Sequence, residues 1–334
     1  MSNTHACSAI AARLMMAGKV LLLTHQRPDG DALGSTFGMR EFLRGNGIAA
    51  DVLIPGALPR RYEELCKDHL NRVFPAELAS YDLFCALDCA NAARLGSGEE
   101  FSADDLRGKN FICIDHHGGN TLAADESWID AGCGSTCQMV MELISFLNQP
   151  INPAGATYLL TGMMTDTGCF CFSNTSGSVL RAAALAADYG ADIEKIANQV
   201  FFNKPLKQLR FEADLVENAL KIECSGQFAY ACITDELLAK YDFDLREDEG
   251  LIDILRSIEG VTVAMLAHRR PDGWRISLRS KDSGFPVRPV AMKFGGGGHD
   301  LAAGCTIDLP DFADVEAAIL PEIQKLLTIG ALEK

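Results

Sequence analysis

Residues 20–35 read VLLLTHQRPDGDALGS. The stretch opens with apolar residues over the length of a strand and continues into apolar residues at helical spacing, so it predicts a buried strand followed by a helix. Asp29 and Asp31 stand on either side of a glycine, and His25 precedes Asp29 by four residues. Carboxylates and an imidazole at the end of a buried strand are costly unless they share a partner. This cost makes the stretch a candidate functional site.

The first 190 residues alternate strand-like and helical stretches. Four continuous apolar runs have the length of strands: 20–25, 50–55, 83–88 and 111–116. Strands that are apolar on both faces and joined by helices predict a mostly parallel sheet with helices on both faces. After residue 220 the strands become short or alternating, which predicts a smaller α+β domain. We therefore predict an α/β protein with an N-terminal domain at 1–190, a helical connector at 191–220 and a C-terminal domain at 221–334.

Composition and charge limit the class of protein. Of the 334 residues, 48% are hydrophobic and 22% are charged, which is ordinary for a globular chain with two cores. The net charge of −15 would not attract a polyanion from a distance, so a phosphate substrate would need metal ions or a local basic patch. No run is apolar enough for a membrane helix and no secretory signal is evident, so we expect a cytoplasmic protein. We interpret the twelve cysteines as small buried hydrophobic residues of a reducing compartment.

Acidic and imidazole side chains also follow other predicted strands. Asp88 ends one strand, Asp115-His116-His117 end the next, and Asp166 follows a run that could be a helix or a strand. The carboxyl ends of the strands in an open parallel sheet line one crevice, so these segments would deliver their side chains to one place. That many carboxylates need divalent cations beside them. The mixed carboxylate and imidazole set suits manganese and also fits magnesium or iron, and its size points to two ions, as in phosphoryl-transfer enzymes.

Each motif has a simpler interpretation when it is taken alone. An aspartate after a strand is often a helix cap or a turn residue, and the glycine run Gly295–Gly298 could be a flexible connector. We interpret Ser135 and Thr136 as a helix cap and leave both outside the predicted site.

Together the motifs resemble those of a known family. Four segments, in this order, are similar to the four motifs of the DHH phosphoesterase superfamily: HQRPDGDALGS (25–35), ALDCANAARLG (86–96), IDHH (114–117) and MMTDTGCF (163–170). FGGGGHDLAAGC (294–305) resembles the signature of the DHH-associated C-terminal domain, and SLRSK (277–281) resembles a substrate-contacting stretch of that domain. The compact two-domain form is similar to the nano-RNase and 3′,5′-bisphosphate nucleotidase branch, rather than to the larger RecJ nucleases.

The resemblance implies roles for residues at matching positions. It implies metal ligands for a first ion, namely His25, Asp29 and Asp88. It implies metal ligands for a second ion, namely Asp31, Asp88, His116 and Asp166, with Asp88 bridging the two ions and catalytic. It further implies that Asp115 orients an imidazole and that His117 faces the scissile phosphate. In the C-terminal domain it implies substrate contacts by Arg279, Ser280, Gly296, Gly297, Gly298 and His299.

The resemblance also implies an activity, a hydrolase of phosphate esters that depends on two divalent metal ions. Its substrates would be oligoribonucleotides of a few residues, linear dinucleotides such as pApA, or 3′-phosphoadenosine 5′-phosphate. A pyrophosphatase or exopolyphosphatase, and a cyclic-dinucleotide phosphodiesterase, are enzymatic alternatives with the same ions. A regulator that binds metal or nucleotide without turnover is the alternative outside catalysis. Homodimers are common in this branch, so we expect a homodimer, and we expect no membrane partner.

Overall fold

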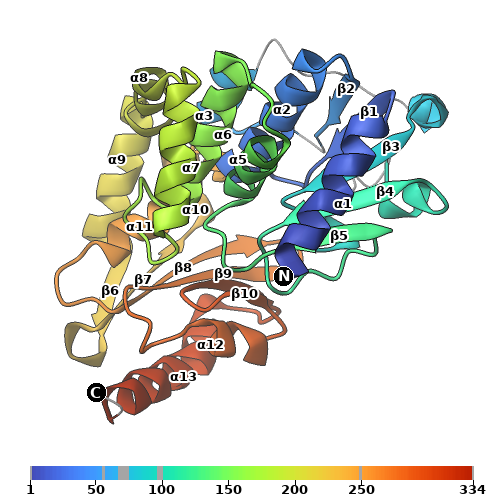
Figure 1. Ribbon diagram of the computed structural model, residues 1–334. Helices are drawn as coiled ribbons and strands as arrows, with labels where there is room; N and C mark the ends of the chain where they lie inside the picture. Colours follow the sequence, from blue (N-terminus) through green and yellow to red (C-terminus); the bar gives the residue numbers. More distant parts are fainter. Residues whose placement is uncertain (1, 55–56, 67–74, 96–100, 248–249, 333–334) are drawn as a thin grey trace. The chain divides into compact units, whose positions relative to one another are not determined.

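The computed structural model of the chain describes residues 2–54, 57–66, 75–95, 101–247 and 250–332 (Figure 1). The chain forms two compact units, Met1–Asn203 and Lys204–Lys334. The division lies inside the segment 191–220 that we predict as a connector. That segment contains four short helical elements, α8 (Ile193–Ile196), η4 (Ala197–Phe201), α9 (Leu206–Asp214) and η5 (Leu215–Ala219).

The first unit is built on a five-stranded parallel sheet, as predicted. Its strand order is β2-β1-β3-β4-β5, with β1 (Lys19–Leu23), β2 (Ala49–Leu53), β3 (Leu83–Leu87), β4 (Phe111–Asp115) and β5 (Glu126–Ile129). Every residue of β3 and β4 is buried, as their apolar runs predict. The apolar runs did not predict β5, because only Trp128 of its four residues is buried.

Helices cover both faces of this sheet (Figure 1). Successive residues of β1 enter two different cores, Val20 and Leu22 a larger one, Leu21 and Leu23 a smaller one. The larger core is shared with α1 (Ser2–Met16), α2 (Gly30–Gly45), α3 (Arg60–Cys66), α5 (Thr136–Leu147), α6 (Pro153–Asp166) and α7 (Gly177–Asp188). The smaller core is shared with η2 (Pro75–Ser80), α4 (Ala92–Leu95) and η3 (Ala103–Leu106). Burial on both faces explains why the central strands β1, β3 and β4 are apolar runs.

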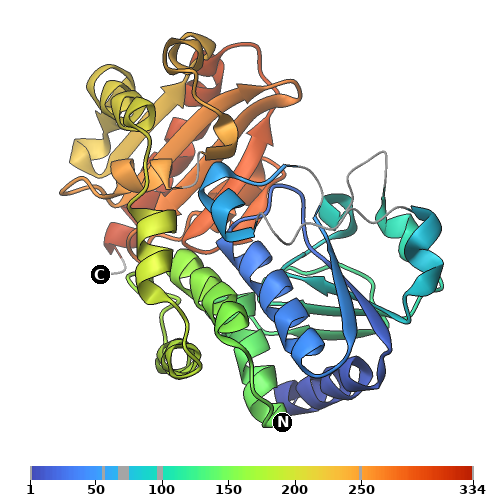
Figure 2. The same ribbon diagram turned by 90° about the horizontal axis from the view of Figure 1, so that it is seen from above.

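The run before Asp166, which the sequence left open between helix and strand, is the last part of α6. This helix packs closely along α2 because glycines line the contact (Figure 2). A Cβ atom on Gly34 of α2 would lie 2.5 Å from the Tyr158 carbonyl oxygen, and one on Gly162 of α6 would lie 2.9 Å from Asp31 Oδ1. The close approach therefore brings the end of α6 beside the start of α2, where two predicted metal ligands lie.

Gly34→Ala is expected to lower the free energy of unfolding by about 1–3 kcal/mol, because the added methyl group meets a backbone oxygen that cannot turn away. Urea unfolding followed by circular dichroism measures the change. Gly45→Ala, at the other end of the same helix, is the control, since a Cβ atom there meets nothing within 4 Å. An unfolding midpoint that is equally unaffected in both variants would contradict the close packing of α2 and α6.

The second unit is built on a six-stranded mixed sheet and is the predicted α+β domain. Its strand order is β10-β11-β9-β8-β7-β6, with β6 (Leu220–Glu223), β7 (Phe228–Ile233), β8 (Val263–Arg270), β9 (Gly273–Ser280), β10 (Gly297–His299) and β11 (Ala302–Ile307). Only β7 and β8 are parallel, and they are connected through α10 (Asp235–Tyr241), η7 (Leu245–Glu247) and α11 (Leu251–Arg256). One face packs on α12 (Arg288–Lys293) and α13 (Phe312–Leu332), and the other packs on α9 and α11.

The structure shows where the cysteines lie and how long and apolar the helices are. All twelve cysteines are free thiols and eight of them are buried, as expected for small core residues. In the described part of the chain, no helix is at once long enough and apolar enough to cross a membrane.

Candidate metal centre

The loops after β1, β3 and β4, together with the ends of α2 and α6, bring six predicted metal ligands into two adjoining groups. We call His25, Asp29 and Asp88 the first cluster, and Asp31, His116 and Asp166 the second cluster. Within each cluster the ligand atoms lie within 4.8 Å of one another. Both clusters lie at the carboxyl end of the parallel sheet, where open α/β sheets bind their ligands.

Asp88 belongs to the first cluster and also borders the second. It follows β3 with a φ of 55°, a left-handed conformation that aspartate adopts rarely, and its side chain is only 1% exposed. Its Oδ2 lies 3.6 Å from His25 Nε2, and its Oδ1 lies 3.6 Å from His116 Nε2. One oxygen therefore faces each group of ligands, an arrangement in which a carboxylate can bridge two cations through both oxygens.

The first cluster combines a helix cap with a fixed imidazole. Asp29 caps α2, since its Oδ1 accepts hydrogen bonds from Asp31 N at 3.1 Å and from Ala32 N at 3.0 Å. The simpler interpretation of a strand-end aspartate is thus true of Asp29, although its carboxylate also lies in the cluster. His25 Nδ1 lies 2.7 Å from the Gln26 carbonyl oxygen. The other ring nitrogen, Nε2, faces Asp88 Oδ2 and is the nitrogen that the ring presents to the cluster.

The start of α5 holds the Asp31 carboxylate of the second cluster. Thr136 N donates to Asp31 Oδ2 at 2.7 Å, and Cys137 N donates to Asp31 Oδ1 at 2.9 Å. These amides have no acceptor inside their own helix, and the helix dipole favours an anion at this end. Ser135 caps the helix as predicted, since its hydroxyl accepts from Gln138 N at 3.0 Å.

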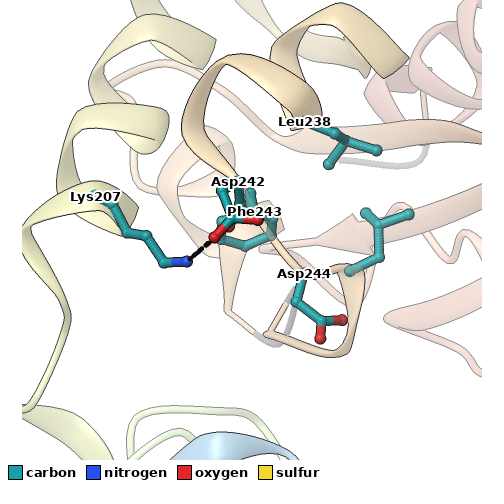
Figure 3. A pocket seen from close by; sticks show the side chains of 6 residues that line it. Lys207, Leu238, Asp242, Phe243 and Asp244 are labelled. Atoms are coloured by element: carbon teal, nitrogen blue, oxygen red, sulfur yellow. Dashed lines mark hydrogen bonds and ion pairs between the residues drawn. The ribbon is translucent and has the colours of Figure 1, made fainter.

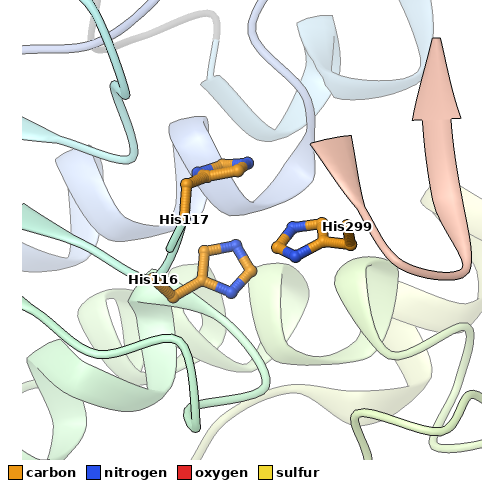
Figure 4. Close-up of side chains that lie close together, drawn as sticks. All are labelled: His116, His117 and His299. Atoms are coloured by element: carbon orange, nitrogen blue, oxygen red, sulfur yellow. The ribbon is translucent and has the colours of Figure 1, made fainter. Parts of the chain in front are cut away.

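Figure 4 shows His116 and His117 side by side after the end of β4, with ring centroids 4.7 Å apart. His116 Nε2 lies 3.4 Å from Asp166 Oδ2, within the second cluster. His117 Nδ1 lies 2.7 Å from Asp115 Oδ1, and Asn120 donates to Asp115 Oδ2 at 2.6 Å. The fully buried Asp115 carboxylate is thus held on both oxygens and sets the orientation of the His117 ring.

Burial and crowding shift the pKa values at the site. Burial and the nearby Asp88 charge raise the pKa of Asp31 to about 7, and burial raises that of Asp166 well above its ordinary value. Burial also disfavours the charged form of Asp88, but the surrounding imidazoles outweigh it and lower its pKa. The carboxylates overcome the opposing effect of burial on both imidazoles, so the pKa of His116 is raised and that of His117 rises to about 10. Carboxylates crowded in this way are a donor set that divalent cations would stabilise in the charged form.

Two residues that touch the site were missed in the sequence. Thr136 donates through Oγ1 to Asp88 Oδ1 at 3.1 Å, and Arg94 Nη2 on α4 lies 2.9 Å from His25 Nδ1. Arg94 belongs to the segment 86–96, which resembles a family motif, but the resemblance implied no role for this residue. Thr136 looked like a capping residue, and nothing local in the sequence connects it with Asp88.

In the second unit, Arg279, Ala302 and His299 occupy one row across β9, β11 and β10. Residues directly opposite in antiparallel strands point to the same face, so the two predicted substrate residues share a face with a small alanine between them. Ser280 points to the other face, is 2% exposed, and donates its hydroxyl to the Asp282 carbonyl oxygen at 3.0 Å. The structure therefore brings Arg279 and His299 onto one surface and does not bring the Ser280 side chain there.

The predicted glycines form the hairpin of β10 and β11. A Cβ atom on Gly296 would lie 2.2 Å from the Gly304 carbonyl oxygen, while Gly298 has a φ of 131°. Gly297 has open space around its Cα. The path of the chain thus requires glycine at Gly296 and Gly298, whatever they contact.

The second unit also contains an open hollow of about 500 Å³ beside α10 (Figure 3). Lys207 Nζ lies in it and donates to Asp242 Oδ2 at 2.8 Å. Leu238, Phe243 and Leu245 supply apolar surface, and none of the predicted substrate residues lines it. Because Lys207 already donates to the Asp242 carboxylate in the same hollow, we assign no binding site there.

Two family models match the chain. Residues 19–163 match the DHH family N-terminal domain, and residues 226–327 match the DHHA1 domain. The first range lies in the first unit and the second range lies in the second unit. The match confirms the resemblance that the motifs indicated.

Two relatives align with this chain over most of their length. The bifunctional oligoribonuclease and PAP phosphatase NrnA of Thermus thermophilus is 29% identical over 317 residues, which cover 93% of this chain and 91% of the relative. The protein of the same name from Bacillus subtilis is 27% identical over 315 residues, with coverages of 92% and 94%. The crystal structure of an exopolyphosphatase-related protein from Bacteroides fragilis has a TM-score of 0.83 and 25% identity, and the match covers 98% of this chain and 97% of that one. RecJ of Thermus thermophilus, solved with Mn²⁺, shares the fold at a TM-score of 0.52 and 15% identity over 54% of its own chain.

Proposed function

We propose, for a chain that belongs to the DHH phosphoesterase family and carries a DHHA1 domain, that it cleaves short oligoribonucleotides to mononucleotides and dephosphorylates 3′-phosphoadenosine 5′-phosphate with two divalent ions. The observation that carries the proposal is the Asp88 carboxylate, whose two oxygens face two different ligand clusters. The names of the relatives from Thermus thermophilus and Bacillus subtilis support the choice of substrates.

The donor set fits the proposed ions. The first cluster would hold one ion and the second cluster, with Asp88, would hold the other. Imidazole and carboxylate ligands without a thiolate suit Mn²⁺, our proposed ion, and also accept Mg²⁺. When bound, such ions neutralise charge on a phosphoryl group and make a water molecule acidic enough to act as the nucleophile.

The remaining predicted residues would bind and orient the substrate. Asp115 holds the His117 ring through Nδ1, so the ring presents Nε2 to a phosphoryl oxygen. In the second unit we propose that Arg279 and His299 bind a substrate phosphate, because an arginine fork can donate two parallel hydrogen bonds to it. Gly297, with open space at its Cα, would let a phosphate approach the backbone. We leave the Ser280 side chain out of this group, since its hydroxyl holds the turn at Asp282.

A phosphoanhydride hydrolase is the second candidate. The name of the exopolyphosphatase-related protein from Bacteroides fragilis favours it, and the same two clusters would serve that reaction. The net charge of −15 speaks against a long polyanionic substrate.

A panel of four substrates tests the proposal. The purified protein is incubated with Mn²⁺ and with pApA, a five-nucleotide RNA, 3′-phosphoadenosine 5′-phosphate or pyrophosphate, and the products are separated by anion-exchange chromatography. We expect mononucleotides from the first two, AMP and phosphate from the third, no product from pyrophosphate, and no turnover in EDTA. Phosphate from pyrophosphate alone would support the second candidate. Binding of the four compounds without any product would support a regulator.

We also propose that the protein works in the cytoplasm as a homodimer. The twelve free cysteines support a reducing compartment. A mass by light scattering of 36.1 kDa, that of one chain, would contradict the dimer.

A further inference from the structure

We infer that Thr136 is a positioning residue of the proposed metal centre, whose hydroxyl fixes the Asp88 carboxylate so that one oxygen faces each cluster. The inference rests on the proposed function, because it concerns how the chain prepares a site for two ions. Thr136 is fully buried, and its Oγ1 lies 3.1 Å from Asp88 Oδ1.

The hydrogen bond distinguishes the two oxygens of Asp88. The terminal torsion of an aspartate is soft, so its carboxylate can turn about the Cβ–Cγ bond. Oδ1 receives the Thr136 hydroxyl and faces His116 of the second cluster, while Oδ2 faces His25 of the first. The Thr136 donor therefore adds to the imidazoles beside this carboxylate, His117 at Oδ1 and His25 at Oδ2, and favours the rotation in which each oxygen faces one cluster.

The backbone of Thr136 makes this donor rigid. Its backbone N–H donates a hydrogen bond to Asp31 Oδ2 at 2.7 Å. Thr136 therefore contacts two carboxylates, Asp31 and Asp88, that would both bind the second ion. The hydroxyl oxygen of neighbouring Ser135 instead accepts a hydrogen bond from Gln138 N, as the cap of α5. A change of the Thr136 side chain would keep the hydrogen bond from the backbone N–H to Asp31. It would remove only the hydrogen bond from the hydroxyl to Asp88.

Other buried threonines of this unit show what a purely local role looks like. Thr36 and Thr161 donate their hydroxyls to carbonyl oxygens one turn earlier in their own helices, Ala32 at 2.5 Å and Thr157 at 2.8 Å. Thr136 is the first residue of α5, so its helix offers no such carbonyl, and the hydroxyl bonds instead to a residue 48 positions away.

Mn²⁺ titration of the metal-free protein by calorimetry tests the inference. Thr136→Val keeps the shape of the side chain and removes the hydroxyl. We expect at least a tenfold loss of affinity for one of the two Mn²⁺ ions. Loss of a residue that hydrogen-bonds a metal ligand typically lowers metal affinity roughly 10- to 100-fold. Thr136→Ser should restore the affinity. Thr161→Val, equally buried at 1% exposed, is the matched control and should bind like the wild type. In turnover assays kcat of Thr136→Val should recover as Mn²⁺ is raised, since the defect is in ion binding.

The outcomes separate the inference from the proposed function. Two Mn²⁺ bound by the wild type, with unchanged affinity in Thr136→Val, would overturn the inference and leave the proposed function standing. A wild type that binds no Mn²⁺ would overturn both. Equal losses in Thr136→Val and Thr161→Val would indicate general packing and would also overturn the inference. Circular dichroism of the metal-free variants checks the fold, and Thr136→Ala repeats the test if the valine variant does not fold.

Discussion

Asp88→Asn is expected to lower kcat on pApA by at least about a thousandfold, because an ion site is worth several kcal/mol of transition-state stabilisation and each 1.36 kcal/mol is a factor of ten. Asn retains the size of the side chain and a carbonyl oxygen for the Thr136 hydroxyl, but it loses the negative charge that two cations would share. Steady-state kinetics with saturating Mn²⁺ measures the effect. Calorimetry should show fewer than two bound Mn²⁺ per chain in the same variant.

Asp130→Asn is the matched control for this prediction. Asp130 directly follows β5, just as Asp88 directly follows β3 of the same sheet. Its side chain accepts a hydrogen bond from Gly132 N at 2.9 Å. It belongs to neither cluster, so we expect wild-type kcat and metal stoichiometry. A kcat of Asp88→Asn within tenfold of the wild type, with the fold intact, would overturn the proposal of two ions.

The parallel sheet could be predicted because its strands are buried on both faces. All residues of β3 are apolar and buried, and β4 is apolar up to its last residue, the buried Asp115. Short apolar runs of this kind are typical of strands buried on both faces. β5 was missed because one buried tryptophan among partly exposed residues does not form an apolar run. The last turns of α6 stayed ambiguous, since a helix apolar on all sides has the same composition as a buried strand.

That several of the proposed ligands come together could be predicted because they follow strands, whereas the residues that hold them in place could not be predicted. Asp88 and Asp115 are placed by the topology of the sheet, which the sequence indicates. Thr136 reaches Asp88 only through the packing of α5, and that contact has no local pattern. The position of Ser280 could have been read from the alternation of β9. Ile276 and Leu278 are fully buried, so a period of two places Ser280 on their face and Arg279 on the other.

Arg279→Ala is expected to lower kcat/KM on pApA by about 10- to 100-fold, as the loss of charge-assisted hydrogen bonds to a phosphate predicts. The loss should be mainly in KM, because Arg279 lies in the second unit and belongs to neither metal cluster. Mn²⁺ stoichiometry should therefore stay at the wild-type value, in contrast to Asp88→Asn. Arg279→Lys keeps the charge without the planar fork and should fall between the wild type and the alanine variant.

Arg269→Ala separates a phosphate contact from a general effect of charge. Arg269 lies on β8 of the same sheet, donates to the Leu309 carbonyl oxygen at 2.8 Å, and stacks on Trp274 with 5.4 Å between the guanidinium carbon and the ring centroid. Both alanine variants make the chain more negative by one charge, so any loss that comes from net charge must appear in both. A KM raised only by Arg279→Ala would support a direct contact with substrate. Equal KM values in the two variants would remove Arg279 from the proposed substrate site and leave the metal centre unaffected.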